Sequence, residues 1–255
     1  MRKSITVILI AICIAVFAIS ANALISYYSA DRAAESDFAG LLPPELAGSD
    51  VAAPGDSKSA FETLLPYYLG LHEENEDMAG WLRIPGTRVS YPVMQTFSNP
   101  EYYLDKNFQR EFSASGTLFA SSISDVTLPS DVVIIYGHRM KTGAMFGSLG
   151  DFLKEEFLLE HDTVIFDTLT ERNEYKVYLI FTLAVGPDVI NEFDYFNYNM
   201  FRDQASFDGF MNRAYAHSET VNPLHTPVFG DKLLLLSTCE YTHENGRLVL
   251  VAVRR

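Results

Sequence analysis

The pattern of apolar and polar positions divides the chain into three parts. No charged residue occurs from Ile5 to Ile25, and a helix of that length reaches about 31 Å, the apolar thickness of one lipid bilayer. Residues 29–59 are rich in Ala, Ser, Gly, Pro and Asp and lack periodicity, which is typical of a flexible stalk. The pattern therefore predicts a tip and membrane segment at 1–28, a stalk at 29–59 and a folded domain at 60–255.

Two interpretations of the apolar run remain open. An uncleaved anchor is favoured because the run is longer than the ~7–15 apolar residues of a typical signal peptide. A cleaved signal peptide is the alternative, because Ala21-Asn22-Ala23 fits an A-x-A cleavage pattern. Arg2 and Lys3 place the N-terminus in the cytoplasm. We therefore expect a single-pass protein of the cell membrane, with an extracellular stalk and an extracellular folded domain.

Short apolar and aromatic runs, separated by turn residues, predict eight strands in the folded domain. These strands are 81–84, 89–93, 117–120, 132–137, 163–167, 175–185, 233–238 and 248–253. Near-helical spacing predicts short helices at 100–104, 146–157 and 203–217, and an N-terminal helix at 61–72 that Pro66 breaks or delays. Irregular strand spacing favours a closed or nearly closed β-barrel over alternating βαβ units.

Charge and cysteine content exclude several functions. The chain carries 33 acidic and 19 basic residues, a net charge of -14, and such a surface repels nucleic acid. No clustered Cys, His or carboxylate set suggests a metal site, and we expect no metal and no cofactor. The two cysteines, Cys13 and Cys239, are too few for a disulfide framework. If the domain is exported, Cys239 is a lone extracellular thiol.

Cys239 is the candidate nucleophile. It follows the apolar run 233–238, so a buried strand would deliver it to an open end of the barrel. Unpaired thiols outside the cell risk oxidation, and a retained one is therefore more often chemically used. The alternative is a half-buried structural cysteine. Position alone leaves these two roles evenly balanced.

A thiolate needs a basic or cationic partner and a donor for the oxyanion. His138 follows the apolar run 132–137 and so occupies the same kind of strand end as Cys239. His243 is close in sequence, but a turn there would point it to solvent. The spacing therefore favours His138 as the partner.

Arg247 starts the last predicted strand, after the turn 244–246. In a hairpin with the Cys239 strand it would return beside the thiol, where a guanidinium can donate two hydrogen bonds to a carbonyl. An ordinary surface ion pair is the equal alternative.

Seven short blocks then resemble the sortases, the cysteine transpeptidases of Gram-positive surfaces, and within them class B. They are NEDMAGWLRIPGT at 75–87, YPVMQ at 91–95, YYL at 102–104, YGHRM at 136–140, GAMF at 143–146, LSTC at 236–239 and RLV at 247–249. Two positions depart from the family pattern. Leu235 replaces a usual Thr, and Tyr241 replaces a frequent acidic residue.

The resemblance implies a mainly β fold, a closed eight-stranded sortase barrel with an N-terminal helix and a further helix in the long loop before the late strands. It makes Cys239, His138 and Arg247 the catalytic residues. The neighbouring positions are then expected to bind substrate or the oxyanion, with the Glu240 backbone N–H as the oxyanion donor. These neighbours are Glu240, Thr238, Ser237 and Tyr136.

The implied reaction cleaves a C-terminal sorting motif of another exported protein through a thioacyl-enzyme and transfers that protein to an amine of a peptidoglycan precursor. Alternatives are a pilin-polymerising sortase, an exported cysteine hydrolase, and a membrane-tethered adhesion or scaffold module without catalysis. The aromatic residues of 193–201 could line a substrate groove or fill the core beneath a loop.

Overall fold

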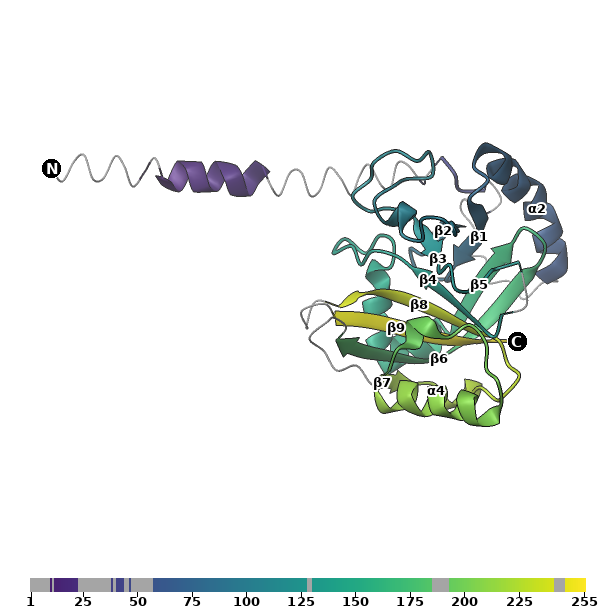
Figure 1. The fold of residues 1–255 in the computed structure, drawn as a ribbon. Helices are drawn as coiled ribbons and strands as arrows, with labels where there is room; N and C mark the ends of the chain where they lie inside the picture. The colour runs from purple at the N-terminus through teal and green to yellow at the C-terminus, as the bar shows by residue number, and fades with distance from the viewer. Residues whose placement is uncertain are drawn as a thin grey trace.

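The computed structural model of the chain describes residues 10, 12–22, 38, 40–43, 46, 57–127, 130–184, 193–240 and 246–255. Figure 1 shows a β-barrel with α2 (Ser57–Glu74) beside β1 and β5, and α4 (Gln204–Ala216) against the outside of the barrel near β6 and β7.

Eight strands close the barrel. In order around it, β5, β1, β2, β3, β4, β8, β9 and β6 pair with their neighbours, and β6 pairs back onto β5. β7 extends the sheet beyond β6. The bounds are β1 Met78–Arg83, β2 Ser90–Met94, β3 Leu118–Ala120, β4 Val132–Tyr136, β5 Thr163–Thr168, β6 Arg172–Ala184, β7 Ser218–Val221, β8 Leu233–Glu240 and β9 Gly246–Arg254. Each predicted strand overlaps one barrel strand, so the predicted closed eight-stranded barrel is confirmed.

The apolar run of β8 is continuous because this strand is buried on both faces. Leu234 and Leu236 point into the core inside the barrel, whereas Leu233 and Leu235 belong to a second core that includes residues of α4. A one-residue slip would exchange the two sets. The two cores thereby fix the register that places the end of β8.

The helices differ from prediction at two points. α2 runs unbroken through Pro66, whose side chain is exposed. The helix persists because Leu64, Tyr68 and Leu71 bury its inner face, and packing outweighs the loss of one helical hydrogen bond. The predicted helix 146–157 is two pieces, η3 (Gly147–Leu153) and α3 (Glu155–Glu160), because Lys154 between them is extended.

The predicted stalk and anchor lie mostly outside the described residues. Within the described part of the chain, no helix has the length and apolar character needed to cross a membrane. Residues 12–22 are helical. Phe38, inside the predicted stalk, is 5% exposed and packs edge-on against Tyr91 with ring centroids 5.2 Å apart. α2 also begins at Ser57, before the predicted domain start at residue 60.

Tyr175 on β6 gives the fold a pH dependence. Burial raises the pKa of its phenol to about 12, whereas an unfolded tyrosine titrates near pH ~10. The buried neutral phenol contributes its full stabilisation below pH ~10, the pKa in the unfolded chain. This stabilisation is lost as the pH rises through ~12, the pKa in the folded chain. We expect Tyr175→Phe to reduce the fall in unfolding free energy between pH ~9 and pH ~11 by about 1 kcal/mol in urea titrations. An equal fall in both proteins would contradict this assignment.

Candidate active site

The backbone brings the three predicted catalytic positions to one end of three neighbouring strands. β4 and β8 are parallel, with Tyr136 paired to Ser237, and the Gly137 N–H donates to the Ser237 carbonyl at 3.2 Å. His138 and Cys239 each stand two residues beyond that pair. β8 and β9 are antiparallel, with Cys239 directly opposite Arg247. The sheet register therefore brings His138 close to the Cys239 and Arg247 positions, although His138 precedes both by more than a hundred residues.

The described side chains cover part of this site. For Cys239 and Glu240 the structure describes the backbone pairing, and their side chains lie outside the described part. The Arg247 side chain is half-buried, and its Nη1 donates to the Gly246 carbonyl at 3.1 Å. Glu240, whose backbone N–H is the predicted oxyanion donor, follows Cys239 on β8 and pairs with Gly246 of β9.

His138 is held by the loop that follows β2. Its Nε2 lies 2.8 Å from the Leu104 carbonyl oxygen, and because a carbonyl only accepts, Nε2 carries a hydrogen. Leu104 ends the short helix η2 (Tyr102–Leu104). A Cβ at Gly116 (φ 56°) would lie 2.4 Å from the same carbonyl oxygen. Gly116 therefore permits the close turn that places the Leu104 carbonyl.

Gly137 allows the end of β4 to pack tightly just before His138. A Cβ at this position would lie 2.3 Å from Leu118 Cδ2 and 2.9 Å from Phe146 Cδ2. The Phe146 N–H also donates to the His138 carbonyl at 3.0 Å, so Phe146 fixes both the packing and the backbone here.

We expect Gly137→Ala to displace Leu118 and Phe146 and to lower the unfolding free energy by about 1–3 kcal/mol. Because the Phe146 N–H holds the His138 carbonyl, displacing Phe146 should also shift His138, and catalytic activity should fall as well. Chemical denaturation and a peptide-cleavage assay measure the two effects. Gly209→Ala in α4 is the matched control, since nothing lies within 4 Å of its Cβ position, and it should stabilise the helix by about 0.5–1 kcal/mol. Equal behaviour of the two variants would contradict the packing argument.

The other predicted residues support the strand ends from within. Ser237 is 1% exposed and its Oγ shares a hydrogen bond of 2.8 Å with the Tyr195 hydroxyl. Thr238 is 3% exposed, and its hydroxyl has no partner among the described residues. Burial raises the pKa of Tyr136, so its phenol stays neutral at physiological pH. The substrate-binding roles of these residues stay predictions.

Tyr195 is a residue of the site region to which the sequence assigned no individual role. It comes from the aromatic segment 193–201, in which Phe193, Tyr195 and Phe201 are buried in the core shared with α4. Core filling is therefore the role of these three side chains. Tyr195 additionally reaches Ser237, two residues before Cys239, and no periodicity in the sequence signals that contact.

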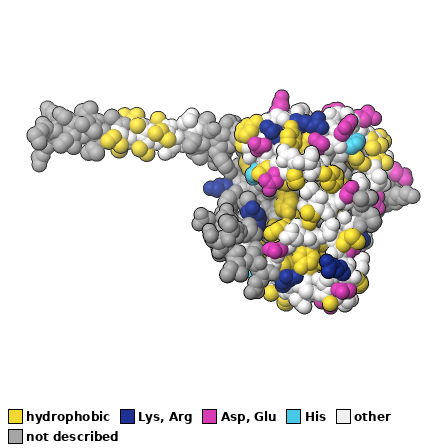
Figure 2. Space-filling view, viewed as in Figure 1, with side chains coloured by type: hydrophobic (Ala, Val, Ile, Leu, Met, Phe, Trp, Pro, Cys, Tyr) yellow, Lys and Arg dark blue, Asp and Glu magenta, His cyan; other side chains and the backbone are white. Residues whose placement is uncertain are grey.

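The surface near His138 is partly apolar. Leu104, whose carbonyl contacts His138, exposes 41% of its surface. Figure 2 shows hydrophobic side chains gathered along the middle of the face drawn there, with acidic and basic side chains around them. Among the described residues, no group of three or more His, Cys, Asp or Glu side chains is placed to hold a metal ion.

Sequence comparison relates this chain to known proteins. The family described as Sortase domain matches residues 82–255. Sortase B of Listeria monocytogenes is 30% identical over 183 residues, which cover 71% of this chain and 70% of that protein. Sortase B of Staphylococcus aureus is 27% identical over 193 residues, or 75% of each.

Solved structures agree with the sequence matches. Bacillus anthracis sortase B in complex with AAEK1 aligns with a TM-score of 0.64 and 30% identity, covering 74% of this chain and 83% of that one. The Staphylococcus aureus sortase B–substrate complex aligns with a TM-score of 0.66 and 25% identity, covering 77% and 92%.

These matches show that the chain belongs to the sortase family, whose members are cysteine transpeptidases. Its similarity to sortases B in both sequence and structure makes it a class B sortase. The seven motif blocks found in the sequence thus led to the correct family and class.

Proposed function

We propose that this chain is a membrane-anchored transpeptidase that cleaves a C-terminal sorting motif of exported proteins and joins them to an amine of a peptidoglycan precursor. The observation that carries the proposal is the register of β4, β8 and β9, which sets His138, Cys239 and Arg247 at one end of adjacent strands. Such a nucleophile, acid–base and oxyanion set performs acyl transfer.

In the first step the Cys239 thiolate attacks a backbone carbonyl of the motif. The tetrahedral oxyanion accepts hydrogen bonds from the Arg247 guanidinium and the Glu240 N–H. As the amide C–N bond breaks, His138 donates a proton to the departing amine. The products are a thioester on Cys239 and a free amine. The Leu104 carbonyl supports this role, because it keeps the His138 ring oriented through a protonated Nε2.

In the second step the acceptor amine attacks the thioester carbonyl. His138 takes the proton that the amine loses, the C–S bond breaks, and the thiolate returns. A new amide joins the cleaved protein to the acceptor. Neither step consumes an oxidant, a metal or an organic cofactor.

The membrane location rests on the apolar run from Ile5 to Ile25. Within its described part, large apolar side chains are exposed, among them Phe17 at 75% and Ile19 at 71%, and an apolar surround such as lipid would cover them. With the N-terminus inside, the domain works at the outer membrane face, where exported clients and a lipid-linked acceptor would both be found.

The test uses the full chain in detergent with a panel of fluorescent pentapeptides and an excess of triglycine, with products identified by mass spectrometry. We expect cleavage of one peptide class and an amide between its acyl part and triglycine. The peptide acid alone, despite excess amine, would instead assign a hydrolase. In a parallel reaction with an added lysine-containing protein, coupling to its lysine side chain and not to triglycine would assign a pilin polymerase. The absence of cleavage in both reactions would overturn the proposal.

A further inference from the structure

His138 is held at two points by different parts of the chain. Its carbonyl accepts a hydrogen bond from the Phe146 N–H at 3.0 Å, and its Nε2 lies 2.8 Å from the Leu104 carbonyl oxygen. The first contact fixes the backbone, whereas the second fixes the direction of the imidazole ring. Any group that determines where the Leu104 carbonyl lies therefore also orients the ring of the proposed acid–base.

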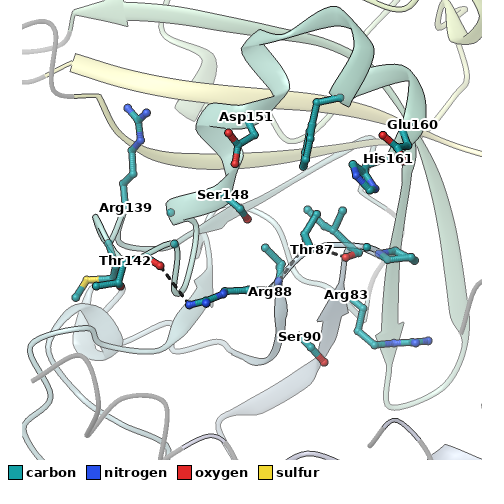
Figure 3. A pocket seen from close by; sticks show the side chains of 18 of the residues that line it. Arg83, Thr87, Arg88, Ser90, Arg139, Thr142, Ser148, Asp151, Glu160 and His161 are labelled. Atoms are coloured by element: carbon teal, nitrogen blue, oxygen red, sulfur yellow. Dashed lines mark hydrogen bonds between the residues drawn. The ribbon is translucent and has the colours of Figure 1, made fainter. Parts of the chain in front are cut away.

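The backbone contact is reinforced by β2 and by the turn between β1 and β2. Arg88 Nη1, in that turn, donates to the Thr142 carbonyl at 3.2 Å, and the Met145 N–H donates to the hydroxyl of Tyr91 on β2 at 3.1 Å. Figure 3 shows the contact of Arg88 with Thr142 in the wall of a cavity of about 1160 Å³, which Arg139 also lines. These contacts hold the main chain of the loop that follows the histidine, and the direction of the ring depends on a different group of residues.

The Leu104 carbonyl lies between two anchored neighbours. The Tyr103 carbonyl accepts from the Thr117 N–H at 2.9 Å, and the Asp105 carbonyl accepts from the Ser113 N–H at 3.0 Å. Thr117 and Ser113 are both buried, so these bonds are shielded from water. They hold η2 and the residue after it against the segment that precedes β3, and they limit where the Leu104 carbonyl can lie.

A hydrogen-bonded network holds the Tyr103 side chain of η2. Tyr103 is fully buried, and its hydroxyl donates to Asp77 Oδ2 and accepts from Asn75 Nδ2, both at 2.8 Å. Arg110 completes the network, since its Nη2 donates to Asn75 Oδ1 at 2.7 Å and to Asp77 Oδ2 at 3.1 Å. The network therefore ties the segment before β1 to the loop that carries the Leu104 carbonyl.

Arg110 takes part in this network at a cost to its own backbone. Its φ is 66°, a left-handed value that residues other than glycine rarely adopt. The Arg110 side chain is 45% exposed, and an exposed ion pair contributes little to stability. The bonds from Arg110 to Asn75 and Asp77 therefore act mainly on geometry, because they fix the two groups that hold the Tyr103 hydroxyl.

The network also accounts for two of the seven motif blocks. Asn75 and Asp77 belong to the block at 75–87, and Tyr103 belongs to the block at 102–104. The two blocks meet through hydrogen bonds that span 26 and 28 residues of sequence. The proposed reaction uses no side chain from either block, and holding the histidine gives both a role in it.

We propose that four hydrogen-bonded residues position the catalytic histidine by fixing the Leu104 carbonyl. They are Asn75, Asp77, Tyr103 and Arg110. The inference rests on the proposed transpeptidation and adds residues that act on its acid–base through another group. With Nε2 bound to that carbonyl, Nδ1 is the ring nitrogen that gives and takes the proton at the reacting amine.

Kinetics of the full chain in detergent, with the fluorescent sorting peptide, test this role. Tyr103→Phe removes the hydroxyl that bridges Asn75 and Asp77. It should lower kcat about tenfold, because the ring is no longer held in one direction, and the KM for the peptide should stay close to its wild-type value. Arg110→Gly removes the side-chain hydrogen bonds of Arg110 but suits the left-handed backbone. It should lower kcat about fivefold and leave the urea midpoint of unfolding nearly unchanged.

Tyr175→Phe is the matched control, because it also removes a buried phenol hydroxyl from the protein. Tyr175 on β6 pairs with Arg254, at the opposite end of β9 from Arg247. This variant should leave kcat and KM unchanged at neutral pH. A loss of kcat as large as that of Tyr103→Phe would overturn the inference, because removal of any buried tyrosine hydroxyl would then have the same effect. Wild-type kcat in both network variants would overturn it as well.

Nuclear magnetic resonance of the full chain in detergent, with isotope-labelled histidine, observes the ring itself and needs no turnover. We expect the neutral His138 ring of the wild-type chain to carry its hydrogen on Nε2. In Tyr103→Phe and Arg110→Gly this tautomer should mix with the form protonated on Nδ1. His138→Gln assigns the signal. The ring of His225, whose Nε2 lies 2.8 Å from Asp162 Oδ2, should be the same in all chains and serves as the internal control.

The two readouts separate this inference from the proposed function. If the wild-type chain cleaves no peptide but the His138 tautomers mix in the variants as expected, the positioning network stands and the proposed reaction fails. If transfer occurs and the His138 signal is the same in the wild type and both network variants, the reaction stands and the positioning network fails.

Discussion

Replacing Cys239 by Ala is expected to lower the rate of sorting-peptide cleavage by at least about 10³-fold, because the thioester cannot form without the nucleophile. The effect should fall on kcat, with peptide binding retained. Mass spectrometry of the wild-type chain with substrate should show the acyl group on the peptide that contains Cys239. Stopped assays with the fluorescent pentapeptide measure the rate.

Cys13→Ala provides the matched control for this experiment. Cys13 is the other cysteine of the chain, and it is exposed on the helical segment 12–22, far in sequence from the barrel. Its replacement should leave kcat and the KM for the sorting peptide unchanged. If the Cys239→Ala chain still cleaved peptide at more than a tenth of the wild-type rate, Cys239 would not be the nucleophile.

Asp167→Asn is expected to lower the unfolding free energy by about 3–5 kcal/mol, because it leaves two buried guanidinium groups without their counter-charge. Asp167 is fully buried on β5. Arg172 Nε and Nη2 donate to its two oxygens at 2.7 and 2.9 Å, and Arg83 Nη2 lies 3.8 Å from Oδ2. The Tyr68 hydroxyl of α2 donates at 3.2 Å. Burial raises the pKa of Tyr68, so it remains a donor at physiological pH.

Urea denaturation of the full chain in detergent measures this loss. Glu171→Gln is the control, since Glu171 pairs with Arg254 at 3.0 Å but its side chain is 53% exposed, and an exposed pair contributes about 1 kcal/mol or less. A loss for Asp167→Asn no greater than for Glu171→Gln would show that the buried pairing of Asp167 with Arg172 and Arg83 does not stabilise the fold.

Sequence patterns were sufficient for the barrel because each strand has a distinct apolar run. They failed where local preference and packing disagree. Pro66 predicts a broken helix, yet the buried residues of α2 keep that helix continuous. β7 was not predicted, because Ser218–Val221 is short and mostly polar, and it is a strand through its pairing with β6.

The family, the class and the three catalytic candidates were determined by the sequence itself, because a nucleophile, a histidine and an arginine at the ends of apolar runs form short motifs that can be recognised locally. Tertiary structure alone decided which residues support them. The Leu104 carbonyl reaches His138 from another loop, Tyr195 reaches Ser237 from another segment, and Arg88 and Arg139 share one cavity. These contacts join residues far apart in the chain, and no local periodicity encodes them.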